Sequence, residues 1–225
     1  MWPTEQNREA WEARFGRPAE PAPRLPEAVR ERLPDINGKH VLHLPCGTGE
    51  ATAELLALGA LVSGIDPSEQ ALTVARERVP GAAFFQAELH ELPLQLRRRR
   101  LSVVYAGEGT LALSPDLALL ASAFASTLRK NGRLVLCDRH PVLDCIDPVG
   151  LRWRESYFEE GRRRLGQIVT AVVGAQLELV ELEELPPPPK ETGGRHDPRV
   201  PATFLLQAVK RDAPPTRPRG ISARA

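Results

Sequence analysis

One stretch, residues 41–66, limits what this chain can fold into. An apolar run (Val41, Leu42 and Leu44) stops at the small-residue turn Cys46-Gly47-Thr48-Gly49; a helix-like segment follows, and a second apolar run ends in Asp66. Strand, glycine turn, helix, strand and acid is the layout of a nucleoside-binding βαβ unit. Glycine lets the backbone approach a ligand with no Cβ in the way. The turn lacks the G-x-G-x-x-G spacing, so a dinucleotide is not the expected ligand.

These residues resemble the first two motifs of class I S-adenosylmethionine (SAM)-dependent methyltransferases. The similar runs are Leu-His-Leu-Pro-Cys-Gly-Thr-Gly and Gly-Ile-Asp-Pro-Ser, although His43 stands at the usual acid and Pro45 at the first glycine. A subgroup of bacterial methyltransferases that resembles this chain carries a similar turn. The resemblance implies SAM as cofactor, S-adenosylhomocysteine (SAH) as product, and a set of cofactor contacts: His43, Pro45, Cys46, Gly47, Gly49, Pro67 and, on the ribose, Asp66.

Further cofactor contacts follow from the same resemblance. Residues 85–93 are similar to the third family motif, with Glu88 at the acid position, and the acid and the next backbone amide, that of Leu89, typically meet the adenine. Ala106 lies at the tip of the fourth strand, which in this fold is beside the reactive methyl group. Trp11 is a candidate for an N-terminal lid over SAM. The plainer alternative for Glu88 is a surface loop acid.

Two residues are candidates for the acceptor side. Glu108 follows the fourth apolar strand and is either a general base, a partner for an amine substrate, or a solvated loop acid. His140 ends the fifth strand and is either a base or substrate ligand, or a histidine bonded to a nearby turn. Trp153, Tyr157 and Phe158 either wall a substrate pocket or pack an added hairpin.

Composition limits the kinds of binding partner that the sequence predicts. A formal net charge of +1 over 225 residues offers no general attraction for nucleic acid or anionic membranes. The arginine runs 97–100 and 162–164 lack interleaved aromatics, which is more typical of solvated loops than of nucleic-acid sites. Three scattered cysteines predict neither a zinc site nor disulfides, and no apolar run approaches a membrane span. We expect a cytoplasmic, bacterial protein, monomeric or homodimeric, with no metal.

Alternating segments predict an α/β fold of three layers, Rossmann-like, with a mostly parallel seven-stranded sheet and an antiparallel last strand. The expected strands are Val41–Leu44, Leu61–Ile65, Ala83–Gln86, Leu101–Tyr105, Arg133–Asp138, Leu177–Glu183 and Thr203–Val209. The expected helices are residues 5–15, Glu27–Leu33, Gly49–Leu58, Ser68–Arg78, Leu117–Leu128 and Leu165–Gly174. Residues 1–37 are expected to form a helical lid, 38–210 the methyltransferase domain and 211–225 a disordered tail.

The expected activity is transfer of the SAM methyl group to an oxygen, nitrogen or carbon nucleophile of a small molecule. The main alternative is a SAM-binding or degenerate methyltransferase-like module that acts through partners, for which His43 and Pro45 are the argument. An RNA methyltransferase that uses the arginine runs is a third possibility.

Overall fold

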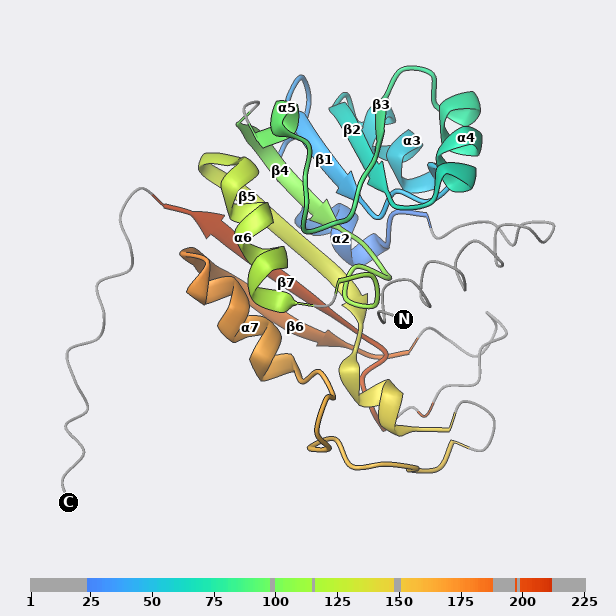
Figure 1. Cartoon of the computed structure of the whole chain (residues 1–225), viewed down its shortest axis with the longest axis vertical. Coiled ribbons are helices and arrows are strands. Elements are labelled where there is room, and N and C mark those ends of the chain that lie inside the picture. The colour runs from blue at the N-terminus through green and yellow to red at the C-terminus, as the bar shows by residue number, and fades with distance from the viewer. Residues whose placement is uncertain are drawn as a thin grey trace.

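A computed structural model describes residues 24–97, 100–114, 116–147, 151–187, 197 and 199–211 of the chain (Figure 1). The helix predicted for residues 5–15, with Trp11, and residues 212–225 of the predicted tail lie outside the described residues. No helix of the described part is both long and apolar enough to cross a membrane.

A seven-stranded sheet in the order β3-β2-β1-β4-β5-β7-β6 forms the middle of the described structure. Its strands are β1 (His40–Leu44), β2 (Leu61–Asp66), β3 (Ala83–Gln86), β4 (Leu101–Ala106), β5 (Leu128–Arg139), β6 (Leu177–Leu185) and β7 (Thr203–Lys210). The first five pair in parallel, and β7 runs antiparallel to both β5 and β6. This confirms the predicted fold class, including the antiparallel pair at the end of the chain.

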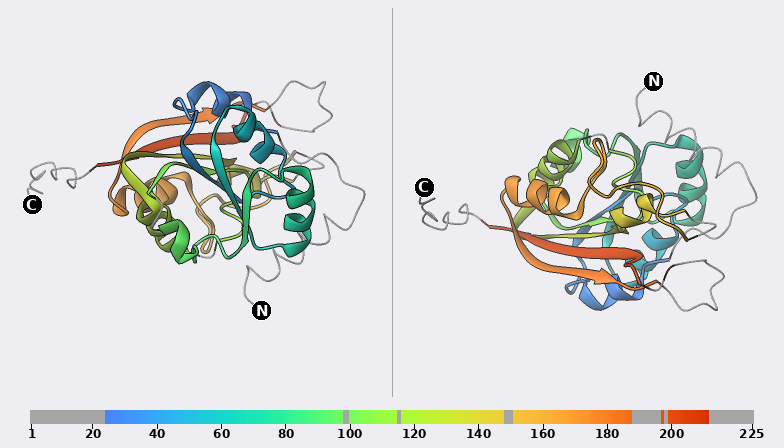
Figure 2. Two further views of the ribbon diagram at one scale, coloured as in Figure 1. Left: turned by 90° about the horizontal axis from the view of Figure 1, so that it is seen from above. Right: turned by 90° about the horizontal axis from the view of Figure 1, so that it is seen from below.

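Helices cover both faces of the sheet, as Figure 2 shows. They are α2 (Glu27–Arg32), α3 (Glu50–Ala57), α4 (Glu69–Arg78), α5 (Leu94–Arg97), α6 (Leu117–Thr127), the 3-10 turn η1 (Pro141–Cys145) and α7 (Leu165–Gly174). One apolar cluster joins α2 and α3 to the sheet, and a second joins α5, α6 and α7 to the opposite face. Because strand side chains alternate between faces, Val41 lies in one cluster and Leu42 in the other.

Short polar side chains begin two of the helices. The Ser68 hydroxyl accepts from the amide of Ala71 at 3.2 Å and caps α4, as the sequence predicts. The Asp116 carboxylate accepts from the amides of Ala118 and Leu119 at 2.7 and 3.0 Å and caps α6. These caps fix the residue at which each helix begins after the loop that follows a strand.

Several predicted ends differ from the structure by one or two residues, and the largest error lies between α6 and β5. The helix that was expected to reach Leu128 ends at Thr127, and β5 begins at Leu128 rather than at Arg133. Leu128 pairs with Leu101, and the register with β4 shifts before Val103. Asn131 takes a left-handed φ of 57°, which accommodates the irregularity. Asn131 therefore lies within the strand, and not after a longer helix as the sequence predicts.

The strand order changes direction between β1 and β4, because the chain first builds outward to β3 and then returns to add β4 and β5 on the other side of β1. In open α/β sheets, ligands bind beyond the carboxyl ends of the strands at such a switch point. The glycine turn after β1 and the loop after β4 therefore flank the place where a ligand is expected.

Candidate functional site

The glycine turn after β1 has the backbone that the sequence predicts. Gly47 and Gly49 have φ values of 51° and 90°, a region that side chains with a Cβ rarely adopt. A Cβ on Gly49 would also lie 3.3 Å from Ala75 and Val79 of the α4 segment. The Gly49 amide donates to the carbonyl of Cys46 at 3.0 Å, which closes the turn. Only glycine fits both positions without strain.

Asp66, at the tip of β2, is bonded to this turn. One carboxylate oxygen accepts from the Gly47 amide at 2.8 Å and the other from the Ser68 amide at 2.9 Å. The side chain is 4% exposed, and burial raises its pKa to about 6 although these two bonds oppose the rise. Each oxygen keeps a lone pair, and no ion pair of Asp66 is found in the described part of the chain. A buried carboxylate of this kind can accept from two hydroxyl donors.

His43 is an uncharged residue in this site. Its Nδ1 lies 2.8 Å from the hydroxyl of Thr52 in α3, and its ring stacks on Tyr105 of β4 with centroids 5.0 Å apart. Burial lowers its pKa to about 3, so the imidazole is neutral at physiological pH. The usual family acid would carry a negative charge here, and this chain offers a neutral ring instead.

The remaining predicted cofactor residues lie close to the same strand tips. Pro45 and Pro67 are buried beside the turn and beside Asp66. Burial raises the pKa of the Cys46 thiol, and the Cys46 amide donates to Ile65 at 2.8 Å. Ala106 ends β4 and is fully buried.

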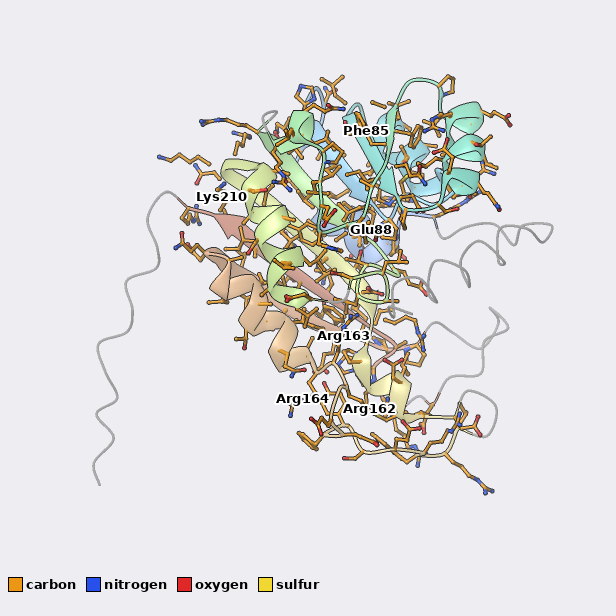
Figure 3. All side chains as sticks on the ribbon, viewed as in Figure 1. Phe85, Glu88, Arg162, Arg163, Arg164 and Lys210 are labelled. Atoms are coloured by element: carbon orange, nitrogen blue, oxygen red, sulfur yellow. The ribbon has the colours of Figure 1, made fainter. Side chains whose placement is uncertain are left out.

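The third motif meets the same edge of the sheet. The amide of Ala87 donates to the Asp66 carbonyl at 3.3 Å, which carries the chain from β3 past the acid. Glu88 is partly exposed, begins a turn closed by the Glu91 amide at 3.0 Å, and lies near the strand tips in Figure 3. Leu89 is fully buried. The adenine contacts of Glu88 and Leu89 stay predictions.

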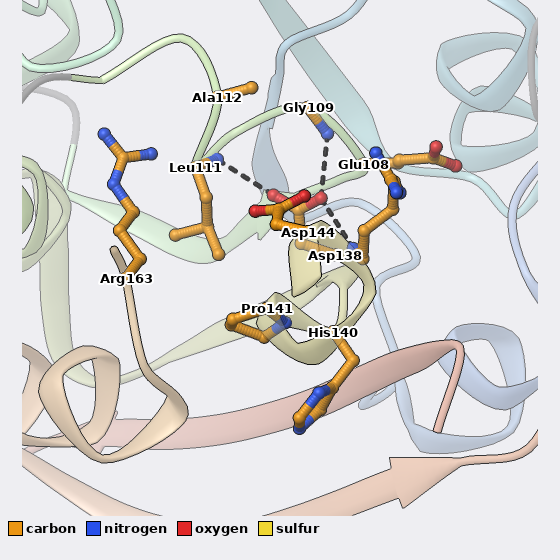
Figure 4. A pocket seen from close by; sticks show the side chains of 10 residues that line it. Glu108, Gly109, Leu111, Ala112, Asp138, His140, Pro141, Asp144 and Arg163 are labelled. Atoms are coloured by element: carbon orange, nitrogen blue, oxygen red, sulfur yellow. Dashed lines mark hydrogen bonds between the residues drawn. The ribbon is translucent and has the colours of Figure 1, made fainter. Parts of the chain in front are cut away.

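A cavity of about 330 Å³ opens beside the tips of β4 and β5 (Figure 4). Its lining combines carboxylates, guanidinium groups and small or apolar residues from the β4 loop, the β5 tip, η1 and the segment before α7: Glu108, Gly109, Leu111, Ala112, Asp138, Arg139, His140, Pro141, Asp144 and Arg163. Both acceptor-side candidates of the sequence, Glu108 and His140, are therefore in one cavity. Its size suits a small molecule rather than a folded macromolecule.

Glu108 stands on a loop that is anchored on both sides. The Gly107 amide donates to the carbonyl of Leu44, the last residue of β1, at 2.8 Å. The Gly109 amide donates to Asp138 at 3.0 Å. The Glu108 side chain is exposed, and no hydrogen bond or ion pair of its carboxylate occurs among the described residues. Its carboxylate is free to meet a ligand in the cavity.

His140 makes contacts inside the protein with both ring nitrogens. The Val142 amide donates to Nδ1 at 3.1 Å, and Nε2 lies 2.8 Å from a carboxylate oxygen of Glu184 in β6, without the alignment of a hydrogen bond. In Figure 4 the ring points away from Asp138 and toward β7. Burial lowers its pKa and the charge of Glu184 opposes this. This geometry matches the turn-bonded alternative, and a role as base stays a prediction.

The three arginines of the second run lie close together in the fold (Figure 3), and each contacts another part of the protein. Arg162 pairs with Glu155 and Glu159. The guanidinium of Arg163 donates to the carbonyl of Ser114 and lies on the cavity wall. Arg164 lies 5.9 Å from the ring centroid of Phe158. None of the three is a free phosphate-binding side chain in this arrangement. In the first run, residues 98 and 99 lie outside the described structure.

The aromatic residues after η1 do not line this cavity. Trp153 and Phe158 are 59% and 75% exposed, and Trp153 forms an antiparallel bridge with Ile146. The Tyr157 hydroxyl accepts from the amide of Leu165 at 2.8 Å. Of the two alternatives open in the sequence, the added hairpin fits these contacts.

Three residues at the site are missed by the sequence reasoning. Asp138 accepts three backbone amides around the cavity, Thr52 contacts His43, and Arg78 at the end of α4 donates to the Thr48 carbonyl at 2.7 Å. Each contact joins residues at least nine positions apart, apart from the Arg139 amide that follows Asp138. No local spacing rule signals such contacts, although the acid in Asp138-Arg-His-Pro marks a strand tip.

Residues 41–132 match the family model described as a methyltransferase domain. This match spans the glycine turn, Asp66, Glu88 and the β4 loop described above. Over residues 41–132 the chain is thus similar to the methyltransferase domain family. SAM is the cofactor of such domains.

Two curated proteins that the chain resembles are named for different methyl transfers. The chain is 35% identical to an O-methyltransferase of Penicillium expansum over 142 residues, which cover 60% of this chain and 50% of that protein. It is 49% identical over 61 residues to a trans-aconitate 2-methyltransferase of Paracidovorax citrulli, which cover 26% and 23%. The chain thus spans half or less of the length of these relatives.

A solved structure shows the same fold. The S-adenosylmethionine-dependent methyltransferase of Mesorhizobium loti superposes with a TM-score of 0.66 at 22% identity, over 81% of this chain and 96% of that one. The methyltransferase domain therefore has the fold that its sequence predicts.

The residues of the methyltransferase domain fit SAM. The buried carboxylate of Asp66 retains acceptor capacity for ribose hydroxyls, and the left-handed glycines leave the turn open to a close ligand. The neutral ring of His43 replaces a charged acid but fills the same buried position on β1.

Proposed function

We propose that this chain transfers the methyl group of SAM to a small-molecule acceptor that binds in the cavity between the tips of β4 and β5. The observation that carries the proposal is the Gly107–Leu44 hydrogen bond, which places the cofactor turn and the cavity wall side by side. Relatives named for O-methylation and for trans-aconitate methylation support a small acceptor.

SAM, when bound, supplies a methyl group already activated on a sulfonium. The protein's contribution is chiefly to hold an acceptor in line with that group and to exclude water. The glycine turn and Asp66 hold the donor side, and the loop that carries Glu108 borders the acceptor side. Where the acceptor atom carries a proton, the free carboxylate of Glu108 accepts it.

A direct test incubates the protein with SAM labelled in the methyl group and a panel of small hydroxyl, amine and carboxylate compounds, with total RNA as a separate arm. We expect label in a small molecule and none in RNA. If Glu108 is a general base, Glu108→Gln lowers turnover by about 10²–10⁴-fold. Glu77→Gln, an exposed change on α4, leaves it unchanged. Label in RNA alone contradicts the proposal.

The second candidate function is a SAM-binding module without transferase activity. The neutral His43 and the proline at residue 45 favour it, because they depart from the usual turn. SAH binding by a protein that labels no acceptor in any arm supports this alternative.

A further inference from the structure

The carboxylate of Asp138 collects three backbone amides at the tip of β5. One oxygen accepts from Gly109 at 3.0 Å and from Arg139 at 2.7 Å, and the other accepts from Leu111 at 2.8 Å (Figure 4). The residue is 4% exposed. An ionised carboxylate offers about four lone pairs, and two of them accept from the backbone of the β4 loop, at Gly109 and Leu111.

The loop has its other anchor on the cofactor side. Gly107 donates to the Leu44 carbonyl, and the Thr110 hydroxyl donates to the Gly107 carbonyl at 2.6 Å. Between these two attachments stands Glu108, whose carboxylate has no such anchor of its own in the described structure. The position of Glu108 in the cavity therefore depends on both ends of the loop being held.

We propose that Asp138 is the positioning residue of the acceptor side: it holds residues 107–111 in place, so that Glu108 faces the cavity, while the cofactor turn is held separately by Asp66. This inference rests on the proposed function for its meaning. Its physical content, a loop held by one buried carboxylate, is independent of any acceptor.

The chemistry of the position favours a carboxylate. An asparagine of the same size has a single acceptor oxygen and two N–H donors, which would face the donor amides of Gly109 or Leu111. Burial raises the pKa of Asp138 to about 6, and the three amides hold it lower than burial alone would. The charged or titratable groups around it are Tyr105, Glu108, Cys137, Arg139, Asp144 and Arg163.

The test measures amide hydrogen exchange at Gly109 and Leu111 in the full chain, with exchange rates corrected for their intrinsic dependence on pH. In the wild-type protein we expect protection at pH 7.5 to exceed protection at pH 5 by about tenfold or more, since hydrogen bonds to a charged group contribute more than neutral ones. In Asp138→Asn, protection is expected to be low and nearly the same at both pH values. Its affinity for SAH is expected to stay within about twofold of wild type.

Asp116→Asn is the matched control, because Asp116 also accepts two backbone amides but caps α6 away from the cavity lining. It should leave the exchange of Gly109 and Leu111 and its pH dependence unchanged. Full protection at both amides in Asp138→Asn would overturn the inference. A loss of SAH affinity in Asp138→Asn as large as its loss of protection would also overturn it. If Asp138→Asn does not fold, the wild-type protein decides, and a lack of protection at Gly109 and Leu111 at pH 7.5 refutes the inference.

Failure of this inference differs from failure of the proposed function. Exchange is measured on the free protein, so it reports the loop whether or not an acceptor is ever methylated. Where the acceptor screen succeeds, Asp138→Asn should raise the KM for the acceptor and lower kcat by about tenfold or more, as expected for a lost charged hydrogen bond. The KM for SAM should change little.

Discussion

Asp66 at the tip of β2 and Asp138 at the tip of β5 are buried carboxylates that both accept backbone amides, and β1 and β4 lie between their strands. Burial raises the pKa of each to about 6, because a charge without solvent is costly and the amides offset only part of that cost. They differ in what they hold. Asp66 is bonded to the glycine turn and Asp138 to the β4 loop.

Asp66→Ala should weaken SAH binding by roughly 1–3 kcal/mol, because two hydroxyl donors of the ribose lose their buried acceptor. Calorimetric titration measures this directly. Asp35→Ala, a change at an exposed residue before β1, is the control and should leave affinity unchanged. If Asp66→Ala and wild type bind SAH with equal affinity, Asp66 does not bind the ribose.

The pH dependence of SAH binding follows from the same residue. Hydroxyl donors bind the ionised carboxylate more tightly, and the pKa of Asp66 in the free protein is about 6. Affinity should therefore be full above pH 6 and fall below it, by up to about tenfold per pH unit for a single proton. Titrations between pH 5 and 8 should show this slope in wild type and not in Asp66→Asn. A flat wild-type profile would be the contrary result.

At the scale of elements, the described part of the predicted lid packs on the sheet. Val29 of α2 is fully buried in the cluster that also holds Val41 and Leu205, and Arg32 pairs with Glu181 and Glu183 of β6. We expect α2 to stabilise the fold of the domain itself. Whether residues before 24 cover SAM stays a prediction.

Val29→Ala should lower the free energy of unfolding by roughly 1–3 kcal/mol, because it removes buried methyl groups and leaves a cavity. Denaturant titration measures this. Val74→Ala on α4, where the side chain is 39% exposed, should change stability by less than about 0.5 kcal/mol. Equal effects of the two changes would mean that α2 is not part of the core.

At the scale of the whole molecule, the elements and their order could be predicted because apolar runs, glycine turns and caps are local signals. Ala83–Gln86 and Leu165–Gly174 have the predicted bounds, whereas the start of β5 does not, because the Leu101–Leu128 pairing is a long-range contact. The same reason explains the site: Asp66 follows from motif spacing, but the bonds of Asp138 and the contacts of His140 depend on segments far apart in sequence.

We expect the turn after β1 and Asp66 to form a working SAM site although His43 and Pro45 depart from the usual motif. The measurement that tests this is calorimetric titration of the full chain with SAM and with SAH. We predict saturable binding of both with dissociation constants on the order of micromolar, about −8 kcal/mol. No binding of either ligand to protein that melts cooperatively would contradict the claim, because it would show that the altered turn does not hold the cofactor.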